Sequence, residues 1–300
     1  MIRGTDELMI NAWKAGTVIP AFNVPYLPIM EPLIKALQDT RCFGLIAVAR
    51  CEWEKFKAKS IRAIYDEYQR VGDQDYTRLH LDHVPVIDED GIEVDYEAII
   101  TDAIEIGYHS VMVDGSRLAL DDNIAAVVKI VQLAHDAGIP AEAELGVVFG
   151  HEPGPLPAYE ELYASGRGFT DLDEARKFAE ATKVDWLSVS VGNIHGAISG
   201  AAKSQKKVEA RINIEHLDRI NKIVSRPLVL HGGSGIKKAS ILEGIKHGIA
   251  KINIGSTIRQ AYEAFVSDSV TKAQDNVYDT TVQLISDELE ITGSVDIINP

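Results

Sequence analysis

Three histidines lie at comparable places in this sequence. Each of them falls within four residues of the end of a short apolar run. They are His83, His195 and His231. Three imidazoles that leave one position open form the ligand set of a catalytic zinc site. The spacing between the three is too wide for a short metal-binding motif, so this hypothesis requires a fold that brings them together. A single histidine of this kind is more often structural than a metal ligand.

The stretch around His231 also predicts an anion site. It reads L-V-L-H-G-G-S-G over 228–235, and residues 237–247 then have the pattern of a helix. A glycine turn that leads from a strand into a helix exposes backbone N–H groups, and the helix dipole adds to their attraction for negative charge. The alternative interpretation is a tight turn with an incidental histidine, because short glycine motifs are only weakly specific.

Short apolar runs alternate with amphipathic segments along most of the chain, which is typical of strands alternating with helices. The runs predicted to be strands are 17–22, 43–49, 78–81, 110–114, 141–145, 186–191, 227–230 and 251–254. The segments predicted to be helical are 29–39, 53–71, 96–106, 121–137, 171–182, 214–224, 237–247 and a region from 257. This series predicts the α/β class and a (β/α)₈ TIM barrel over residues 1–278, with a C-terminal helical appendage over 279–300.

An open, doubly wound sheet is the competing topology. It is disfavoured because no glycine fingerprint follows the first strand and no second domain is evident. The segment from 150 to 168 interrupts the alternation with several prolines and glycines, and it predicts a long loop. Glu152 lies in this loop and is either a solvated acid or a base that a closing loop carries to the site.

In a TIM barrel the active site lies at the C-terminal ends of the strands. The polar residues at these expected ends are Asn23, Asp82, Asp114, Glu142, Glu144, Asn193, Asn253, Gly255 and Ser256. Asp82 directly precedes His83, so its carboxylate could act as an acid or base, or orient a metal ligand. His80 alternates with Asp82 along its strand, and we expect it to be a core residue or a partner of the ligands.

Composition and charge exclude several classes of protein. The formal net charge of −15 argues against a nucleic-acid surface. No apolar run is long enough for a membrane span, and the N-terminus lacks the layout of a signal peptide. The two cysteines, Cys42 and Cys51, do not suggest a disulfide framework and fit a reducing cytoplasm. We therefore expect a cytoplasmic enzyme that binds neither nucleic acid nor a membrane.

With these residues identified, the chain resembles the class II, metal-dependent ketose-bisphosphate aldolases, and among them the fructose- and tagatose-bisphosphate aldolases. The resemblance runs in order from about residue 16 to residue 264. It is carried by P-A-F-N-V at 20–24, L-D-H at 81–83, S-V-M-V-D-G-S at 110–116, A-E-L-G at 143–146, G-N-I-H-G at 192–196, P-L-V-L-H-G-G-S-G at 227–235 and K-I-N-I at 251–254. Each piece is short, but together they are highly specific.

The resemblance implies zinc or another divalent cation bound by His83, His195 and His231, with Glu144 and Asp114 as alternative ligands or as partners of the ligands. A monovalent cation is a further candidate cofactor. It implies that Asp82 protonates or polarises the aldehyde oxygen and that Glu152 removes a proton from the ketone donor. Asn253 would steady the enediolate and Asn23 would contact the substrate. The implied phosphate-binding positions are Gly196, Gly232, Ser234, Gly255 and Ser256.

The resemblance further implies a phosphorylated sugar as substrate and a homodimer or homotetramer. Several positions depart from the family pattern: Ala49, His151, Pro153, Ile198, Ser199 and the sequence Gly255-Ser256-Thr257. The metal and proton-transfer residues are retained, whereas the phosphate set is thinned; Arg50 and Trp53 are candidate replacements. We therefore predict cleavage of a phosphorylated ketose to dihydroxyacetone phosphate and an aldehyde. The alternatives are a nonphosphorylated ketone or oxo-acid donor, and a non-catalytic aldolase-like subunit.

Overall fold

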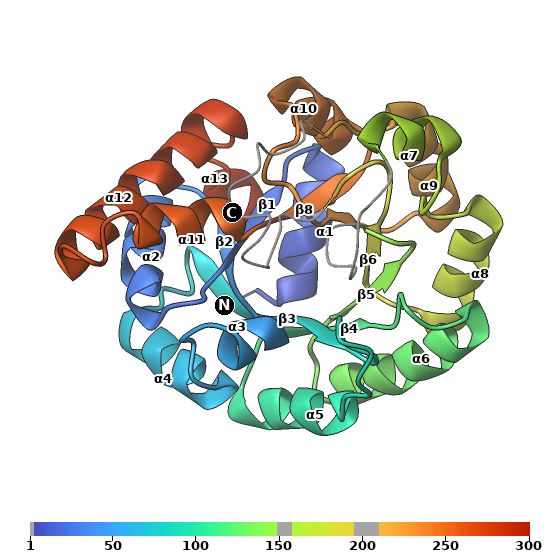
Figure 1. Cartoon of the computed structure of the whole chain (residues 1–300), viewed down its shortest axis with the longest axis horizontal. Helices are drawn as coiled ribbons and strands as arrows, with labels where there is room; N and C mark the ends of the chain where they lie inside the picture. Colours follow the sequence, from blue (N-terminus) through green and yellow to red (C-terminus); the bar gives the residue numbers. More distant parts are fainter. Residues whose placement is uncertain (1–2, 149–157, 195–209) are drawn as a thin grey trace.

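The computed structural model describes residues 3–148, 158–194 and 210–300 of the 300-residue chain. Eight parallel strands form a closed barrel in sequence order, with β8 paired to β1 (Figure 1). The strands are β1 (Ile19–Asn23), β2 (Gly44–Ala49), β3 (Thr77–Pro85), β4 (Ser110–Asp114), β5 (Ala141–Leu145), β6 (Trp186–Val189), β7 (Leu228–Leu230) and β8 (Ile249–Ile254). The predicted (β/α)₈ barrel is confirmed.

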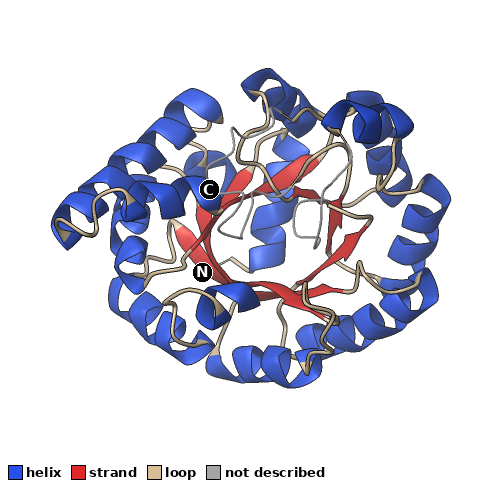
Figure 2. Cartoon of the chain, in the orientation of Figure 1, coloured by secondary structure: helices blue, strands red, loops and turns tan. Residues whose placement is uncertain are grey.

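The helices form an outer ring around the barrel, except for α1, which is seen at the centre of the view (Figures 1 and 2). They are α1 (Thr5–Ala15), α2 (Met30–Asp39), α3 (Arg50–Glu54), α4 (Ile61–Val71), α5 (Tyr96–Ile106), α6 (Leu120–Asp136), α7 (Tyr159–Ser165), α8 (Leu172–Thr182), α9 (Ile214–Val224), α10 (Lys238–Lys246), α11 (Ser256–Glu263), α12 (Val270–Gln283) and α13 (Val295–Ile298). A short 3₁₀ turn, Leu27–Ile29, precedes α2, and a π-helical turn, Leu284–Glu288, follows α12. None of the helices in the described ranges has the length and apolarity needed to cross a membrane.

The strand residues alternate between two apolar cores, because successive side chains of a strand point to opposite faces. Ile46 and Val48 of β2 belong to the large core between the sheet and the outer helices. Leu45 and Ala47 of the same strand belong to a smaller core inside the barrel, which α1 also contributes to. Apolar side chains therefore fill part of the barrel interior on the side that α1 covers.

The third strand bulges where the predicted site begins. The pairing of β3 with β4 shifts register between Leu81 and Val84, and His83 has a φ of 34°. In a regular strand Asp82 and His83 would point to opposite faces, but a bulge changes the direction of the chain and re-aims a side chain. Both side chains can therefore face the same end of the barrel.

Several expected element boundaries differ from the structure. The first helix, α1, was not among the predicted elements. The helix expected over 53–71 is two helices, because Ser60 begins α4 by accepting the Ala63 N–H at its hydroxyl (3.1 Å). Residues 159–165 of the expected loop form α7, and β3 continues past residue 81 to Pro85. The expected boundary at residue 278 falls within α12, and the appendage as a separate unit stays a prediction.

Candidate active site

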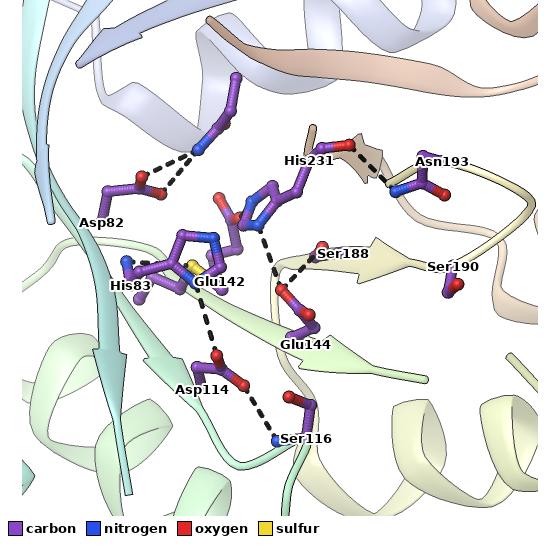
Figure 3. Close-up of polar contacts among 12 residues, drawn as sticks. Asp82, His83, Asp114, Ser116, Glu142, Glu144, Ser188, Ser190, Asn193 and His231 are labelled. Carbon is purple, nitrogen blue, oxygen red and sulfur yellow. Dashed lines mark hydrogen bonds and ion pairs between the residues drawn. The ribbon is translucent and has the colours of Figure 1, made fainter. Parts of the chain in front are cut away.

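Two of the three predicted histidines meet at the carboxyl end of the barrel. His83 lies in the bulge of β3 and His231 directly follows β7, and their ring centroids are 4.2 Å apart. Each of Asp82, His83 and His231 offers a nitrogen or oxygen atom within 4.8 Å of the others. Figure 3 shows these side chains facing one another above β4 and β5. A divalent ion could be held between them, since imidazole and carboxylate are common zinc ligands.

Carboxylates engage both imidazoles, at one nitrogen of His83 and at both nitrogens of His231. Asp114 Oδ2 lies 3.4 Å from His83 Nδ1, and Glu142 Oε1 lies 2.9 Å from His231 Nε2. Glu144 Oε2 lies 3.1 Å from His231 Nδ1 and also accepts a hydrogen bond from Ser188 Oγ at 3.3 Å. Proteins commonly orient metal-binding histidines with a carboxylate on the second nitrogen.

These contacts displace the pKa values of the groups. Burial would lower the pKa of His83, but Asp82 and Asp114 outweigh it and raise the value to about 10. Burial would raise the pKa of Asp114, but His83 lowers it to about 2. The pKa of His231 is also raised, because Glu142 and Glu144 outweigh burial and the repulsion from His83. The imidazole of His83 is therefore protonated in the metal-free site, and a bound cation would replace its proton.

Asp82 is held by two amides. Asn23 Nδ2 donates to Asp82 Oδ2 at 2.9 Å, and Asn253 Nδ2 lies 2.9 Å from each of the two carboxylate oxygens. The side chain of Asp82 is 1% exposed. Burial would raise its pKa, but the Lys251 ammonium and His83 hold it well below the usual range. Asn253 Oδ1 is buried and has no hydrogen-bond partner within residues 3–148, 158–194 and 210–300, so it can accept a hydrogen bond from a ligand.

Beneath these residues lies a layer of fully buried ionisable groups. Lys251 Nζ lies 2.7 Å from Glu142 Oε2 and 3.1 Å from His80 Nε2. His80 Nδ1 lies 2.9 Å from Ser110 Oγ, and the His80 ring packs against Trp186 of the interior core. His80 is thus a partner of the site rather than an isolated core residue. The layer lies between the apolar core inside the barrel and the imidazole of His231.

Glu52, which interacts with Asp82 and Asn23, is a further buried carboxyl that was not among the predicted site residues. Its side chain is 6% exposed, and its Oε2 accepts the Ala49 N–H at 2.7 Å to cap α3. Burial raises its pKa to about 8, while the Ala49 N–H and the Asn23 amide oppose this shift. The available signal was a capping pattern, a glutamate three residues after the expected end of the second strand. That pattern predicts a helix start, and only the fold places the carboxyl beside Asn23.

The turn after His231 uses its glycines for backbone conformations and close contacts that a side chain would not allow. Gly232 and Gly235 have φ values of 67° and 92°, and a Cβ on Gly233 would lie 2.7 Å from Ile252 side-chain atoms. Ser234 Oγ accepts a hydrogen bond from Thr257 Oγ1 at 3.1 Å, which ties this turn to the start of α11. Gly255 and Ser256 precede and begin α11, so the predicted phosphate positions Gly232, Ser234, Gly255 and Ser256 lie on two neighbouring turns.

A cavity of about 320 Å³ adjoins the same turns. Its lining includes Gly233, Ser234, Ile254, Thr257 and Leu284. Leu284 comes from the C-terminal segment, which thus closes one side of the cavity. The candidate replacement Arg50 pairs with Asp88 at 3.2 Å, so its guanidinium is already engaged by a loop carboxylate.

Some predicted site residues lie outside the described residues: Glu152, His195 and Gly196, together with the departures His151, Pro153, Ile198 and Ser199. Their roles stay predictions. The described residues just before His195 do connect to the site, since Asn193 Nδ2 donates to the His231 carbonyl at 3.0 Å. The chain therefore passes close to His231 at Asn193, two residues before His195.

The residues present fit a divalent cation. Two imidazoles and a carboxylate converge, and further carboxylates contact Nδ1 of His83 and both nitrogens of His231. The buried Asn253 Oδ1 beside Asp82 adds an acceptor at the same place. A third imidazole from the segment after residue 194 would complete the predicted ligand set.

Comparisons with known proteins identify the family of this chain. The family model described as "Fructose-bisphosphate aldolase class-II" matches residues 3–295. The YdjI aldolase from Escherichia coli K12 is 25% identical, with a TM-score of 0.74 over 97% of this chain and 100% of that chain. The fructose-bisphosphate aldolase from Campylobacter jejuni is 17% identical, with a TM-score of 0.73 over 97% and 96%, which shows likeness of fold. The chain belongs to the class II fructose-bisphosphate aldolase family.

Proposed function

We propose that this protein is a zinc-dependent lyase that reversibly cleaves a phosphorylated ketose to dihydroxyacetone phosphate and an aldehyde. The observation that carries the proposal is the convergence of His83 and His231 beside Asp82, with ring centroids 4.2 Å apart. His83, His231 and His195 would hold the ion, and Asp114 and Glu144 would support the ligands. When bound, the divalent cation supplies a Lewis acid that stabilises the negative charge of the enediolate.

Asp82 is suited to handle the proton at the aldehyde oxygen. Two amides fix its carboxylate, which faces the same end of the barrel as the histidines. Asn253 places one amide oxygen at this point, where it can steady the hydroxyl groups of the donor. The second proton, on the donor carbon, needs a separate base because one group cannot occupy both positions. We assign that role to Glu152 by the family resemblance.

The phosphate is proposed to bind at the turns that hold Gly232, Ser234, Gly255 and Ser256. Both turns lead into helices, α10 and α11, whose first N–H groups favour an anion. A local site of this kind is needed because the protein as a whole has a net charge of −15. A homodimer or homotetramer and a cytoplasmic location stay predictions from the resemblance.

The test combines metal content with a half-reaction that does not require the aldehyde. The purified protein is analysed for divalent metal, and dihydroxyacetone phosphate is added in deuterated water. We expect about one ion per chain and chelator-sensitive exchange at the hydroxymethyl carbon, detected by proton NMR. The His231→Ala variant should lose both the bound metal and the exchange. His109→Ala is the control, because His109 accepts the Leu79 N–H outside the site.

Each result decides between the hypotheses. Bound metal without exchange would overturn the phosphorylated donor and favour a different ketone or an oxo-acid. A protein that takes up no divalent metal would overturn the metal mechanism and favour a non-catalytic subunit. Unchanged metal content in His231→Ala would overturn the ligand assignment.

A further inference from the structure

A single lysine occupies the centre of the buried ionisable layer below the metal-binding histidines. Lys251 lies in β8 and is fully buried, as are Glu142 and His80. Its Nζ atom lies 2.7 Å from Glu142 Oε2, 3.1 Å from His80 Nε2 and 3.6 Å from Asp82 Oδ1. Those three partners also form a group whose geometry could hold a metal ion. The ammonium therefore takes the place that a second cation would take.

The hydrogen bonds around Lys251 fix the proton positions on the neighbouring imidazole. An ammonium only donates, so His80 Nε2 must accept, and the His80 proton then lies on Nδ1, which faces Ser110 Oγ at 2.9 Å. Burial and the neighbouring ammonium lower the pKa of His80, in agreement with a neutral ring. The contact with Lys251 therefore fixes the proton position on His80, at one end of the layer.

The other end of the layer reaches a metal-binding histidine. Glu142 accepts from Lys251 at Oε2 and contacts His231 Nε2 with Oε1 at 2.9 Å. Because an ionised carboxylate only accepts, Nε2 of His231 must carry the proton of this contact. Nδ1 contacts Glu144 Oε2 at 3.1 Å, so it is the nitrogen whose proton an ion bound beside Glu144 would displace.

We propose that the Lys251 ammonium is a built-in cation of the metal site, a positioning residue that holds Glu142 against Nε2 of His231 and thereby assigns Nδ1 to the divalent ion. This inference rests on the metal site of the proposed function. The lysine also balances the charge of Glu142 and Asp82, which a barrel interior would otherwise hold as unpaired carboxylates. Without it, Glu142 loses the partner that fixes its orientation.

The test measures zinc affinity by competition with a chromophoric chelator, using zinc alone and no substrate. Lys251→Met keeps the bulk of the side chain and removes the charge, and Glu142→Gln keeps the shape and removes the carboxylate. We expect each variant to bind zinc about 10- to 100-fold more weakly, the usual cost of losing a partner of a metal ligand. The double variant removes both charges. Its zinc affinity should be no lower than that of the weaker-binding single variant, because Lys251 acts through Glu142.

The matched control is Arg78→Met. Arg78 is also a buried cation of the barrel, 2% exposed, but it donates to backbone carbonyls, including those of Thr77 (2.8 Å) and Arg3 (2.9 Å). It should lower thermal stability without weakening zinc binding. If Lys251→Met fails to fold, the zinc affinity of the charge-balanced double variant is compared with that of Glu142→Gln instead.

The outcomes separate this inference from the proposed function. Wild-type protein that binds no zinc would overturn the proposed metal site. Wild-type protein that binds zinc, with unchanged affinity in Lys251→Met, would overturn the role of Lys251 alone. If the losses of zinc affinity in the two single variants multiply in the double variant, Lys251 does not act through Glu142. If Arg78→Met loses as much zinc affinity as Lys251→Met, the effect is a general one of removing a buried cation. Either result would overturn the inference.

Discussion

Asn253 places its amide nitrogen 2.9 Å from each of the two oxygens of Asp82, so β8 and β3 are joined across the barrel at the proposed acid. Asn23 of β1 adds a third contact to the same carboxylate. The carboxylate is thus fixed in position before a substrate arrives. Such preorganisation matters because a proton-transfer group acts only within hydrogen-bonding reach of its partner.

Removing this acid should affect turnover more than substrate binding. We expect Asp82→Ala to lower kcat by about 10²–10⁴-fold, the usual contribution of general acid–base catalysis. Asn253→Ala should lower kcat less, because Asn23 still holds Asp82. Steady-state kinetics of ketose cleavage checks both variants. Asn276→Ala is the control, since its amide donates to the Ala261 carbonyl at 2.8 Å, and a comparable loss there would contradict the assignment.

Zinc uptake should release protons. The pKa of His83 is raised to about 10, so its ring holds an extra proton in the metal-free protein near pH 8, and the pKa of His231 is raised as well. A nitrogen must be deprotonated before it can ligate an ion. Adding zinc to weakly buffered metal-free protein with a pH indicator should therefore acidify the solution, and zinc affinity should fall as the pH is lowered. Uptake without acidification would contradict the raised pKa of the two rings.

Glu52 should make the metal-free protein less stable at higher pH. Burial raises its pKa from 4.5 to about 8, so the folded protein holds a proton there that the unfolded chain has released. The folded state therefore binds more protons between these values, and the free energy of unfolding falls as the pH rises through that window, by at most about 1.4 kcal/mol per pH unit.

The Glu52→Gln variant isolates this effect. It keeps an oxygen that can accept the Ala49 N–H, so the cap of α3 is retained. Urea unfolding at pH 5, 6, 7 and 8 should show a smaller decline for the variant than for the wild type. Glu54→Gln, an exposed position on the same helix, serves as the control. Parallel declines in the wild type and Glu52→Gln would contradict the raised pKa of Glu52.

Ser234 should contribute to binding of a phosphorylated donor. Its hydroxyl lies on the glycine turn and accepts from Thr257 at 3.1 Å. Loss of one hydrogen bond is worth about 0.5–1.5 kcal/mol, so Ser234→Ala should raise KM for dihydroxyacetone phosphate about 2- to 12-fold. KM for nonphosphorylated dihydroxyacetone should not change. Ser225→Ala, on an exposed turn, is the control. An equal rise for both donors would place Ser234 away from the phosphate.

The sequence by itself determined the order and type of most elements. Strands β4 and β5 and helices α5 and α9 have the expected bounds, because their apolar periods are regular and their ends are marked by turn residues or caps. The regular series of eight units was enough to predict the barrel. A barrel then directs every strand end to one face, which is why widely spaced residues such as His83 and His231 could be grouped before the fold was seen.

The tertiary structure alone decided how the site is built. The bulge that turns Asp82 and His83 to the same end arises from the pairing of β3 with β4, and pairing is not encoded in the local pattern of either strand. In the sequence, Lys251 is only the first residue of the predicted strand 251–254, and β8 begins two residues earlier, at Ile249. Its role follows from contacts with Glu142 and His80, which lie more than 100 residues away along the chain. Contacts across the barrel depend on closure of the sheet, and local sequence periodicity carries no information about them.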